Sequence, residues 1–364
     1  MPRNNRVPRS VLITRFSALG DVAMAIPVVY SVCRGNPDTK FVFVTKKSQE
    51  SLFINPPANL TVLGIDFKNE YHRVIDLWRL FRELRKEYGI DAYADLHGVL
   101  RSYALCALAT LHGIKCHSIR KGRRNKRALT RSRNKVMLPL LSSRARYREV
   151  FFRFGFSMNE TFKGLYGDGG KADPAIFASV TAPKKEGDKW VGIAPFAKHP
   201  GKIYPTDMME HVVEEIASKP GVKVFLFGGG EHERKILGEW ASKFDNVISL
   251  ADKRHGFPLE LALLSHLDTM VSMDSANMHL ASLVGVRVVS VWGATHPYCG
   301  FKGFGQQETD IVQLPMTCRP CSVFGNKPCA RGDYHCLRGI PPSMIVNKVN
   351  KVLFTQDKED RRKE

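Results

Sequence analysis

The sequence predicts an α/β protein with two Rossmann-like domains, each built on a mostly parallel sheet that helices cover on both faces. Two observations predict this fold class. Short β-rich runs alternate with helical patterns, first from Val11 and again from Lys189, and such alternation is typical of parallel sheets. The chain also has 364 residues with 43% hydrophobic content, which is enough for two cores of similar size.

Composition marks the domain boundaries. Residues 163–189 are rich in Gly, Asp and Lys and have only a weak apolar pattern, as expected of an interdomain linker or hinge. We therefore expect an N-terminal domain over residues 1–170, a linker over 171–188 and a C-terminal domain over 189–340 that carries a cysteine-rich loop. A helix and a charged tail should follow over 341–364.

The first domain opens on a buried strand, residues 11–14, that turns at residues 17–20 into a helix beginning at Asp21. A carboxylate at the carboxyl end of a strand is well placed to meet a ligand. An Asp at a helix N-terminus also satisfies free backbone N–H groups, so a capping role is the alternative. The remaining elements expected in this domain are strands at 40–45, 60–65 and 90–96 and helices at 74–88, up to 112, and 139–156.

The second domain places a polar or Gly-rich loop after each of its strands. The expected strands are 189–194, 222–227, 267–272 and 286–292, and the loops are 195–205, 228–233, 273–279 and 293–297. Because the carboxyl ends of parallel strands meet at one edge of a sheet, these loops should line the rim of a binding cleft. Two domains that face each other would put Asp21 across this cleft from Lys202 and Asp274.

The formal net charge of +20 calls for an anionic partner, such as nucleic acid, a membrane surface or a phosphorylated substrate. Residues 115–135 contain ten Lys and Arg residues and no acidic residue; a solvated loop is the alternative interpretation. The sequence contains no run of eighteen apolar residues, so it predicts no membrane span. Residues 1–9 are basic, but the hydrophobic core of a signal peptide does not follow them. We therefore expect a cytoplasmic protein.

The chain has eight cysteines, which we expect to be reduced in a large chain without a secretion signal. Cys33, Cys106 and Cys116 lie in or near apolar segments and are expected to be small core residues. The other group is Cys318, Cys321, Cys329 and Cys336, with Cys299 nearby. Its C-x2-C pair and two further thiols are compatible with a structural zinc site. Reduced structural thiols are the favoured alternative, and disulfides are the least expected.

The motifs taken together resemble glycosyltransferase family 9, the ADP-heptose:lipopolysaccharide heptosyltransferases. They are RFSALGDV (15–22) with Pro27, DLHGVLRS (95–102), KIYP (202–205), FGGGEHE (227–233), DSANMH (274–279) and WGATHP (292–297). The resemblance covers most of the chain and implies a GT-B fold, two Rossmann-like domains facing across a cleft. It also implies an acceptor-binding N-terminal domain, a donor-binding C-terminal domain, and inverting transfer without a metal or other cofactor.

The resemblance assigns roles to individual residues. Asp21 matches the general base, Lys202 the donor-phosphate lysine, and either Glu231 or Glu233 the acidic residue near the nucleoside ribose. The full donor-binding set is Lys202, Gly229, Gly230, Glu231, Glu233, Asp274, Ser275, Ala276, Asn277 and His279. The acceptor-binding set is Ser17, Gly20, His97, Arg101, Arg120 and Arg124. His279 is expected to be a packing residue more than a catalytic one, and His97 stands where the family commonly has glutamine.

The implied function is transfer of heptose from ADP-heptose to the lipopolysaccharide inner core, either Kdo–lipid A or a heptosylated core. Such an acceptor is anionic and lipid-linked, so the basic segment should hold the enzyme peripherally at the cytoplasmic face of the inner membrane. One alternative is a GT-B transferase with another nucleotide sugar or acceptor. Another is a zinc-dependent nucleic-acid-binding protein, but the basic segment lacks interleaved aromatic residues, so no nucleic-acid partner is expected.

Overall fold

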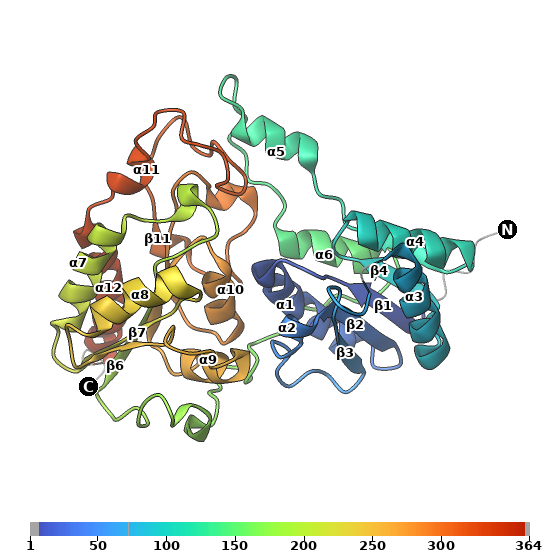
Figure 1. The fold of residues 1–364 in the computed structure, drawn as a ribbon, viewed down its shortest axis with the longest axis horizontal. Coiled ribbons are helices and arrows are strands. Elements are labelled where there is room, and N and C mark those ends of the chain that lie inside the picture. Colours follow the sequence, from blue (N-terminus) through green and yellow to red (C-terminus); the bar gives the residue numbers. More distant parts are fainter. Residues whose placement is uncertain (1–6, 72, 361–364) are drawn as a thin grey trace. The chain divides into compact units, whose positions relative to one another are not determined.

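Residues 7–71 and 73–360, which a computed structural model describes, contain two parallel β-sheets (Figure 1). Each sheet belongs to one of two compact units of the chain. The first unit comprises Met1–Gly122 and Leu141–Gly167, and the second comprises Arg123–Leu140 and Asp168–Glu364. No helix in the described part of the chain is both long and apolar enough to cross a membrane.

The first unit is built on the strands β1 (Ser10–Thr14), β2 (Lys40–Lys46), β3 (Leu60–Ile65), β4 (Ala92–Asp95) and β5 (Lys115–Ser118). Its helices are α1 (Leu19–Gly35), α2 (Lys47–Glu50), α3 (Val74–Tyr88), α4 (Leu100–Leu111) and α6 (Ser143–Phe152). The strand order is β3-β2-β1-β4-β5. Helix α1 packs on α6, and α3 packs on α4. All residues of β1 are buried, as expected of a central strand in a sheet covered on both faces.

The second unit is built on β6 (Lys189–Ala194), β7 (Val222–Leu226), β8 (Val247–Ser249), β9 (Thr269–Met273), β10 (Val288–Val291) and β11 (Ile311–Val312). Its α-helices are α5 (Arg123–Thr130), α7 (Thr206–Ala217), α8 (Glu231–Ala241), α9 (Phe257–Leu264), α10 (Ala276–Leu283), α11 (His335–Arg338) and α12 (Pro342–Asp360). Short 3₁₀ helices are η1 (Pro174–Phe177), η2 (Pro200–Lys202), η3 (Pro297–Cys299) and η4 (Glu308–Asp310). The strand order is β11-β10-β9-β6-β7-β8.

Two segments belong to the second unit although the sequence does not predict this. Residues 123–140, which contain α5, group with the second unit although they lie within the expected N-terminal domain. Helix α12 is not separate from the second core either. It packs on α7, and its residues Ile345, Val349 and Leu353 are buried among those of the sheet. Contacts between buried side chains, and not position along the chain, therefore determine to which unit these segments belong.

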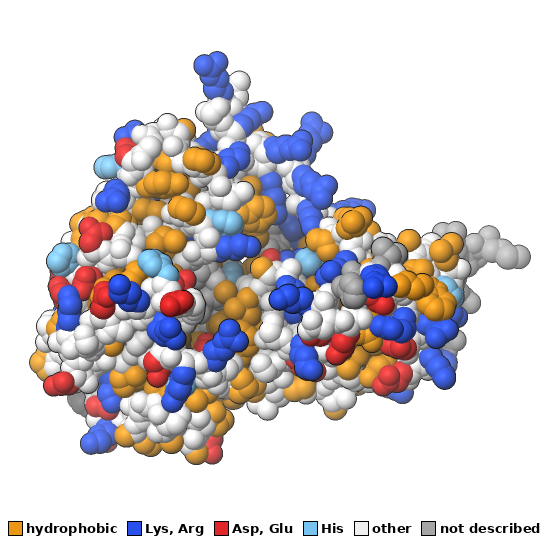
Figure 2. Space-filling view, in the orientation of Figure 1, with side chains coloured by type: hydrophobic (Ala, Val, Ile, Leu, Met, Phe, Trp, Pro, Cys, Tyr) orange, Lys and Arg blue, Asp and Glu red, His pale blue; other side chains and the backbone are white. Residues whose placement is uncertain are grey.

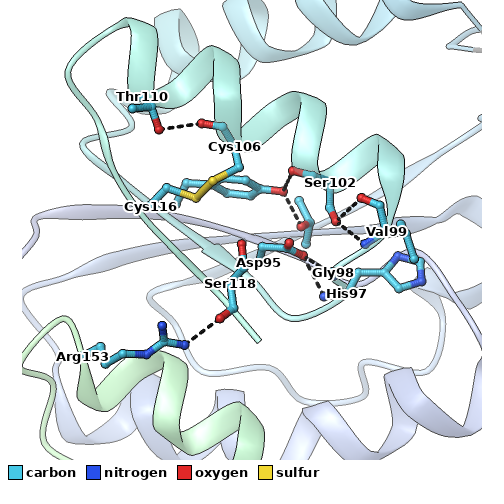
Figure 3. The surroundings of a disulfide bond; sticks show 12 residues. Asp95, His97, Gly98, Val99, Ser102, Cys106, Thr110, Cys116, Ser118 and Arg153 are labelled. Atoms are coloured by element: carbon cyan, nitrogen blue, oxygen red, sulfur yellow. Dashed lines mark hydrogen bonds between the residues drawn. A yellow bond between two sulfur atoms is a disulfide. The ribbon is translucent and has the colours of Figure 1, made fainter. Parts of the chain in front are cut away.

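The expectation that Cys106 and Cys116 are reduced core thiols is wrong for this structure, which joins them in a disulfide (Figure 3). Cys106 lies on α4 and Cys116 on β5, and the short connection between these elements brings their Cα atoms to 6.0 Å. This separation is within the range that a disulfide can span. Cys33 is free and buried, as expected.

Candidate active site

Each sheet has one point where the direction of its strand order reverses, and ligands of open α/β sheets bind outside the carboxyl ends of the strands there. In the first unit this point lies between β1 and β4, so it is flanked by the loop that leads to Asp21 and by the loop that follows Asp95. In the second unit it lies between β6 and β9, so it is flanked by the loops that carry Lys202 and Asp274. Asp21, Lys202 and Asp274 thus each lie in or directly after a loop at the expected edge of their own sheet.

Asp21 lies in the first turn of α1 and has two partners. Its carboxylate accepts a hydrogen bond from the backbone N–H of Ala18 at 3.4 Å, which is the predicted capping contact. The same Oδ2 atom forms an ion pair with the buried guanidinium of Arg15, which also donates to the Leu96 carbonyl at 3.0 Å. The Asp21 side chain remains 28% exposed. A capped and charge-paired carboxylate therefore still faces solvent, where a substrate hydroxyl can reach it.

The loop after β4 is held by Asp95 and carries His97. The Asp95 carboxylate accepts from the backbone N–H groups of His97 at 2.8 Å and Gly98 at 2.9 Å (Figure 3). Gly98 has a φ of +62°, and an added Cβ would lie 3.0 Å from the Lys121 side chain, so both backbone conformation and space favour glycine there. The His97 ring packs edge-on against Phe16.

Burial lowers the pKa of His97 to about 3, and the nearby Arg15 guanidinium adds to this effect. His97 is only 8% exposed, and its Nδ1 atom has no hydrogen-bond partner. The imidazole is therefore neutral at physiological pH.

We expect the His97→Gln variant to lose less stability on acidification than the unchanged protein. The pKa of His97 is about 3 in the folded chain and about 6.5 in an unfolded one. Between these values the unfolded state binds a proton that the folded state does not, so stability falls as the pH falls from about 6.5 towards 3. Melting temperatures between pH 7 and pH 4 measure the difference. The exposed His232→Gln serves as control, and equal slopes for His97→Gln and the unchanged protein would contradict the prediction.

The other predicted acceptor residues do not all lie together. Ser17 and Gly20 lie in the turn before Asp21 and are partly exposed. Arg101 stacks its guanidinium over Phe67 at 5.3 Å. Arg120 forms an ion pair with Glu149 at 3.3 Å. Arg124, in contrast, lies on α5, which groups with the second unit.

The second unit holds a buried ion pair between two of the predicted donor residues. Lys202 Nζ lies 2.8 Å from Asp274 Oδ2, and Asp274 also accepts from the Thr295 hydroxyl at 2.8 Å. The stem of Lys202 packs against Gly325, where an added Cβ would lie 2.6 Å from Lys202 Cγ and where φ is +74°. Three loops, those after β6, β9 and β10, thus meet around one charged pair.

Residues 274–279 form the turn from β9 into α10. Ser275 precedes the helix in an extended conformation, and its side chain makes no capping hydrogen bond. Ser275, Ala276 and Asn277 are partly exposed, whereas His279 is buried on the helix, in the packing position expected for it. The first N–H groups of α10 therefore lie beside partly exposed residues, an arrangement suited to an anionic group.

The Gly-rich loop after β7 leads into α8. The backbone N–H of Gly229 donates to the Glu233 carboxylate at 2.7 Å, so Glu233 folds back on its own loop. Glu231 is exposed in the first turn of α8, and Gly230 adopts a φ of +95° before it. Of the two acidic residues, Glu231 is thus the freer one to contact a ligand.

Several residues outside the predicted set hold the site. Arg15 positions Asp21, and it belongs to the RFSALGDV motif, which is the signal that points to it. The hydroxyl of Tyr147 donates to the Asp21 carbonyl at 3.3 Å. The buried Arg319 donates to the carbonyls of Trp292 at 3.1 Å and Thr295 at 3.0 Å. Arg319 lies inside the C-x2-C pair, so that motif fixes the loop after β10 through its arginine.

The four cysteines from Cys318 to Cys336 are all free. Within residues 7–71 and 73–360, no three His, Cys, Asp or Glu side chains are grouped so that they could hold a metal ion. The structural zinc site stays an untested prediction.

Two units, each with a parallel sheet and polar loops at its carboxyl edge, are the architecture of the GT-B fold, and solved structures share this fold. The glycosyltransferase family 9 protein from Veillonella parvula superposes with a TM-score of 0.72 at 15% identity over 98% of this chain and 99% of that one. The E. coli heptosyltransferase WaaC with ADP-2-deoxy-2-fluoro heptose gives a TM-score of 0.61 at 18% identity over 87% and 97%.

The family model of glycosyltransferase family 9 (heptosyltransferase) matches residues 77–329. The chain belongs to this family and is a glycosyltransferase. Among curated relatives, lipooligosaccharide heptosyltransferase 2 of Campylobacter jejuni is 22% identical over 341 residues, which are 92% of this chain and 96% of the relative. The resemblance seen in the sequence and the predicted fold class are thus confirmed.

Proposed function

We propose that the enzyme transfers heptose from ADP-heptose to the inner core of lipopolysaccharide, with Kdo–lipid A or a heptosylated core as acceptor. Family membership and the name of the Campylobacter relative support a heptosyl transfer. The ADP-2-deoxy-2-fluoro heptose bound to the E. coli relative supports the donor. The observation that carries the proposal is the buried Lys202–Asp274 pair at the point where the second sheet reverses its strand order.

On the donor side, the departing ADP accumulates negative charge on its diphosphate. Lys202 has three N–H donors and uses one on Asp274, so the others can bind phosphate oxygens. The N-terminus of α10 adds backbone N–H groups and the positive end of its dipole. Together these groups stabilise the leaving group without a metal ion. The exposed Glu231 would accept hydrogen bonds from the ribose hydroxyls in this proposal.

On the acceptor side, Asp21 acts as the general base. The acceptor oxygen attacks the anomeric carbon of heptose on the face opposite the diphosphate, so the configuration inverts as the bond to ADP breaks. The acceptor hydroxyl gives its proton to the Asp21 carboxylate. Arg15 holds this carboxylate in place through their ion pair, and the neutral His97 can orient the acceptor by a hydrogen bond. The proposed acceptor is lipid-linked, so the enzyme works peripherally at the cytoplasmic face of the inner membrane.

We expect ADP-heptose to raise the melting temperature more than ADP-glucose, UDP-N-acetylglucosamine or GDP-mannose does. A ligand at 100 times its Kd stabilises the folded state by about 2.7 kcal/mol. A thermal-shift panel, followed by a transfer assay with Kdo–lipid A, measures donor and acceptor in turn. Stabilisation and turnover with a different nucleotide sugar would reassign the donor, and binding to RNA without any nucleotide-sugar binding would overturn the proposal.

A further inference from the structure

We propose that residues 123–139, here called the docking segment, bind the enzyme to an anionic phospholipid bilayer and insert an apolar tip between the lipid headgroups. The inference rests on the proposed function in one respect, because a lipid-linked acceptor requires the enzyme to work at a membrane. The segment comprises α5 and the loop after it, which lie at the top of Figure 1.

Helix α5 is fixed to the second unit. Leu129 is fully buried, and the Lys126 ammonium lies over the rings of Phe301 at 5.2 Å and Phe324 at 5.6 Å. Phe324 directly precedes Gly325, which packs on the stem of Lys202. The docking segment is therefore attached to the same loop that supports the donor-site lysine.

The loop after α5 is anchored on both sides of its apolar part. Lys135 Nζ donates to the carbonyls of Thr317 at 3.3 Å, Cys318 at 2.7 Å and Pro320 at 3.1 Å. On the other side, the backbone N–H of Leu140 donates to the Tyr298 carbonyl at 2.9 Å. The intervening residues 136–139 are thus held between two attachment points on the second unit.

The residues between these two anchors, 136–139, form the apolar tip of the docking segment, and all four are exposed. Val136 is 40% exposed, Met137 43% and Leu138 65%, and Pro139 continues the exposed run. Exposed neighbouring apolar side chains of this kind mark interaction sites. Side chains of this size, next to a basic helix, are suited to the boundary between headgroups and acyl chains.

The charges around the tip select an anionic partner. Residues 115–148 contain no Asp or Glu. Figure 2 shows Lys and Arg side chains over this part of the molecule. The exposed arginines of the segment are Arg123, Arg124, Arg127, Arg131 and Arg133. Nucleic acid would use the arginines but not the apolar tip, and the segment has no aromatic residue on which a base could stack. The combination of arginines and tip therefore favours an anionic bilayer.

Vesicle sedimentation with the full-length chain tests the proposal. We expect binding to vesicles of equal parts phosphatidylcholine and phosphatidylglycerol, weakening with salt, and little binding to phosphatidylcholine alone. The Met137→Asp, Leu138→Asp double variant should bind at least about tenfold more weakly. The Arg127→Ser, Arg131→Ser double variant should bind about 30-fold more weakly. Ile176→Asp, which replaces an exposed apolar residue elsewhere in the same unit, should bind as the unchanged protein does.

Insertion has its own readout. A tryptophan introduced by Leu138→Trp should be quenched by brominated lipid acyl chains, whereas one introduced by Ile176→Trp should not. Vesicle binding by the tip variant at the strength of the unchanged protein, or an unquenched tryptophan at position 138, would overturn the proposal, as would binding to RNA in preference to vesicles.

These outcomes are separable from failure of the proposed function. The tip variant should still transfer heptose to a deacylated, water-soluble acceptor while losing activity on acceptor embedded in vesicles. Loss of vesicle binding with retained transfer to the soluble acceptor concerns the docking segment alone. Absence of transfer to either acceptor, with normal vesicle binding, would instead refute the proposed function.

Discussion

The Asp21→Asn variant is expected to lose transfer activity by about 10²- to 10⁴-fold, the usual contribution of a general base, while it binds ADP-heptose as tightly as the unchanged protein. Asparagine keeps the size of the side chain and can still accept from the Ala18 N–H, but it cannot take a proton from the acceptor hydroxyl. The donor residues lie in the other unit of the chain, so donor affinity should not change. Calorimetry of ADP-heptose binding and single-turnover transfer measure the two effects.

Asp76→Asn is the matched control for the capping role of Asp21. Asp76 occupies the same position in the first turn of α3, where it accepts from the Arg73 N–H at 2.9 Å and pairs with Arg79 at 3.5 Å. In both variants asparagine can keep the capping hydrogen bond but loses the negative charge that pairs with an arginine and with the helix dipole, so both should melt at slightly lower temperature. Only Asp21→Asn should lose turnover. If that variant kept full turnover, or if it lost donor binding, Asp21 would not be the general base.

The Lys202→Met variant is expected to bind ADP-heptose roughly 100-fold more weakly, which corresponds to about 2.7 kcal/mol, and also to be less stable. The first effect follows from the loss of the ammonium that we propose binds the diphosphate. The second follows because Asp274 would be left as a buried carboxylate without its cation, a change that costs about 3 kcal/mol. Calorimetry and thermal denaturation measure them separately.

A double variant distinguishes these two roles of Lys202. In Lys202→Met with Asp274→Asn, no buried charge is left unpaired, so most of the lost stability should return while donor affinity stays low. Recovery of donor affinity in the double variant would show that Lys202 serves only to neutralise Asp274. Lys184→Met is the control, since Lys184 forms a comparable ion pair with Asp268 at 2.6 Å in the same unit. It should lower stability and leave donor binding unchanged.

The two α/β units could be predicted from the sequence because their patterns are local. The strands β1, β2, β3, β6, β7, β9 and β10 are continuous apolar runs, and each was expected within two residues of its observed bounds. The strands β8 and β11 have only three and two residues, too few for a recognisable period. They exist because neighbouring strands supply their hydrogen bonds.

The site could be predicted in part for the same reason. Asp21, Lys202 and Asp274 each follow a strand within a short motif, so the residues themselves are visible in the sequence. Their partners are not, because an ion pair such as Lys202–Asp274 joins positions that lie far apart along the chain. Arg319 is visible only as part of a C-x2-C pair, and its hydrogen bonds to the loop after β10 depend on folding.

The sequence by itself determined the class of fold, the family motifs, and the two residues, Asp21 and Lys202, to which we give roles in the reaction. It could do so because periodic patterns and short motifs consist of residues that are close together along the chain. Only the tertiary structure decided that α5 belongs to the second unit, that Cys106 meets Cys116, and that Arg15 and Lys202 are the counter-ions of buried or half-buried carboxylates. These features arise from contacts between distant segments, which form when the chain buries its apolar surface and pairs the charges left beside it.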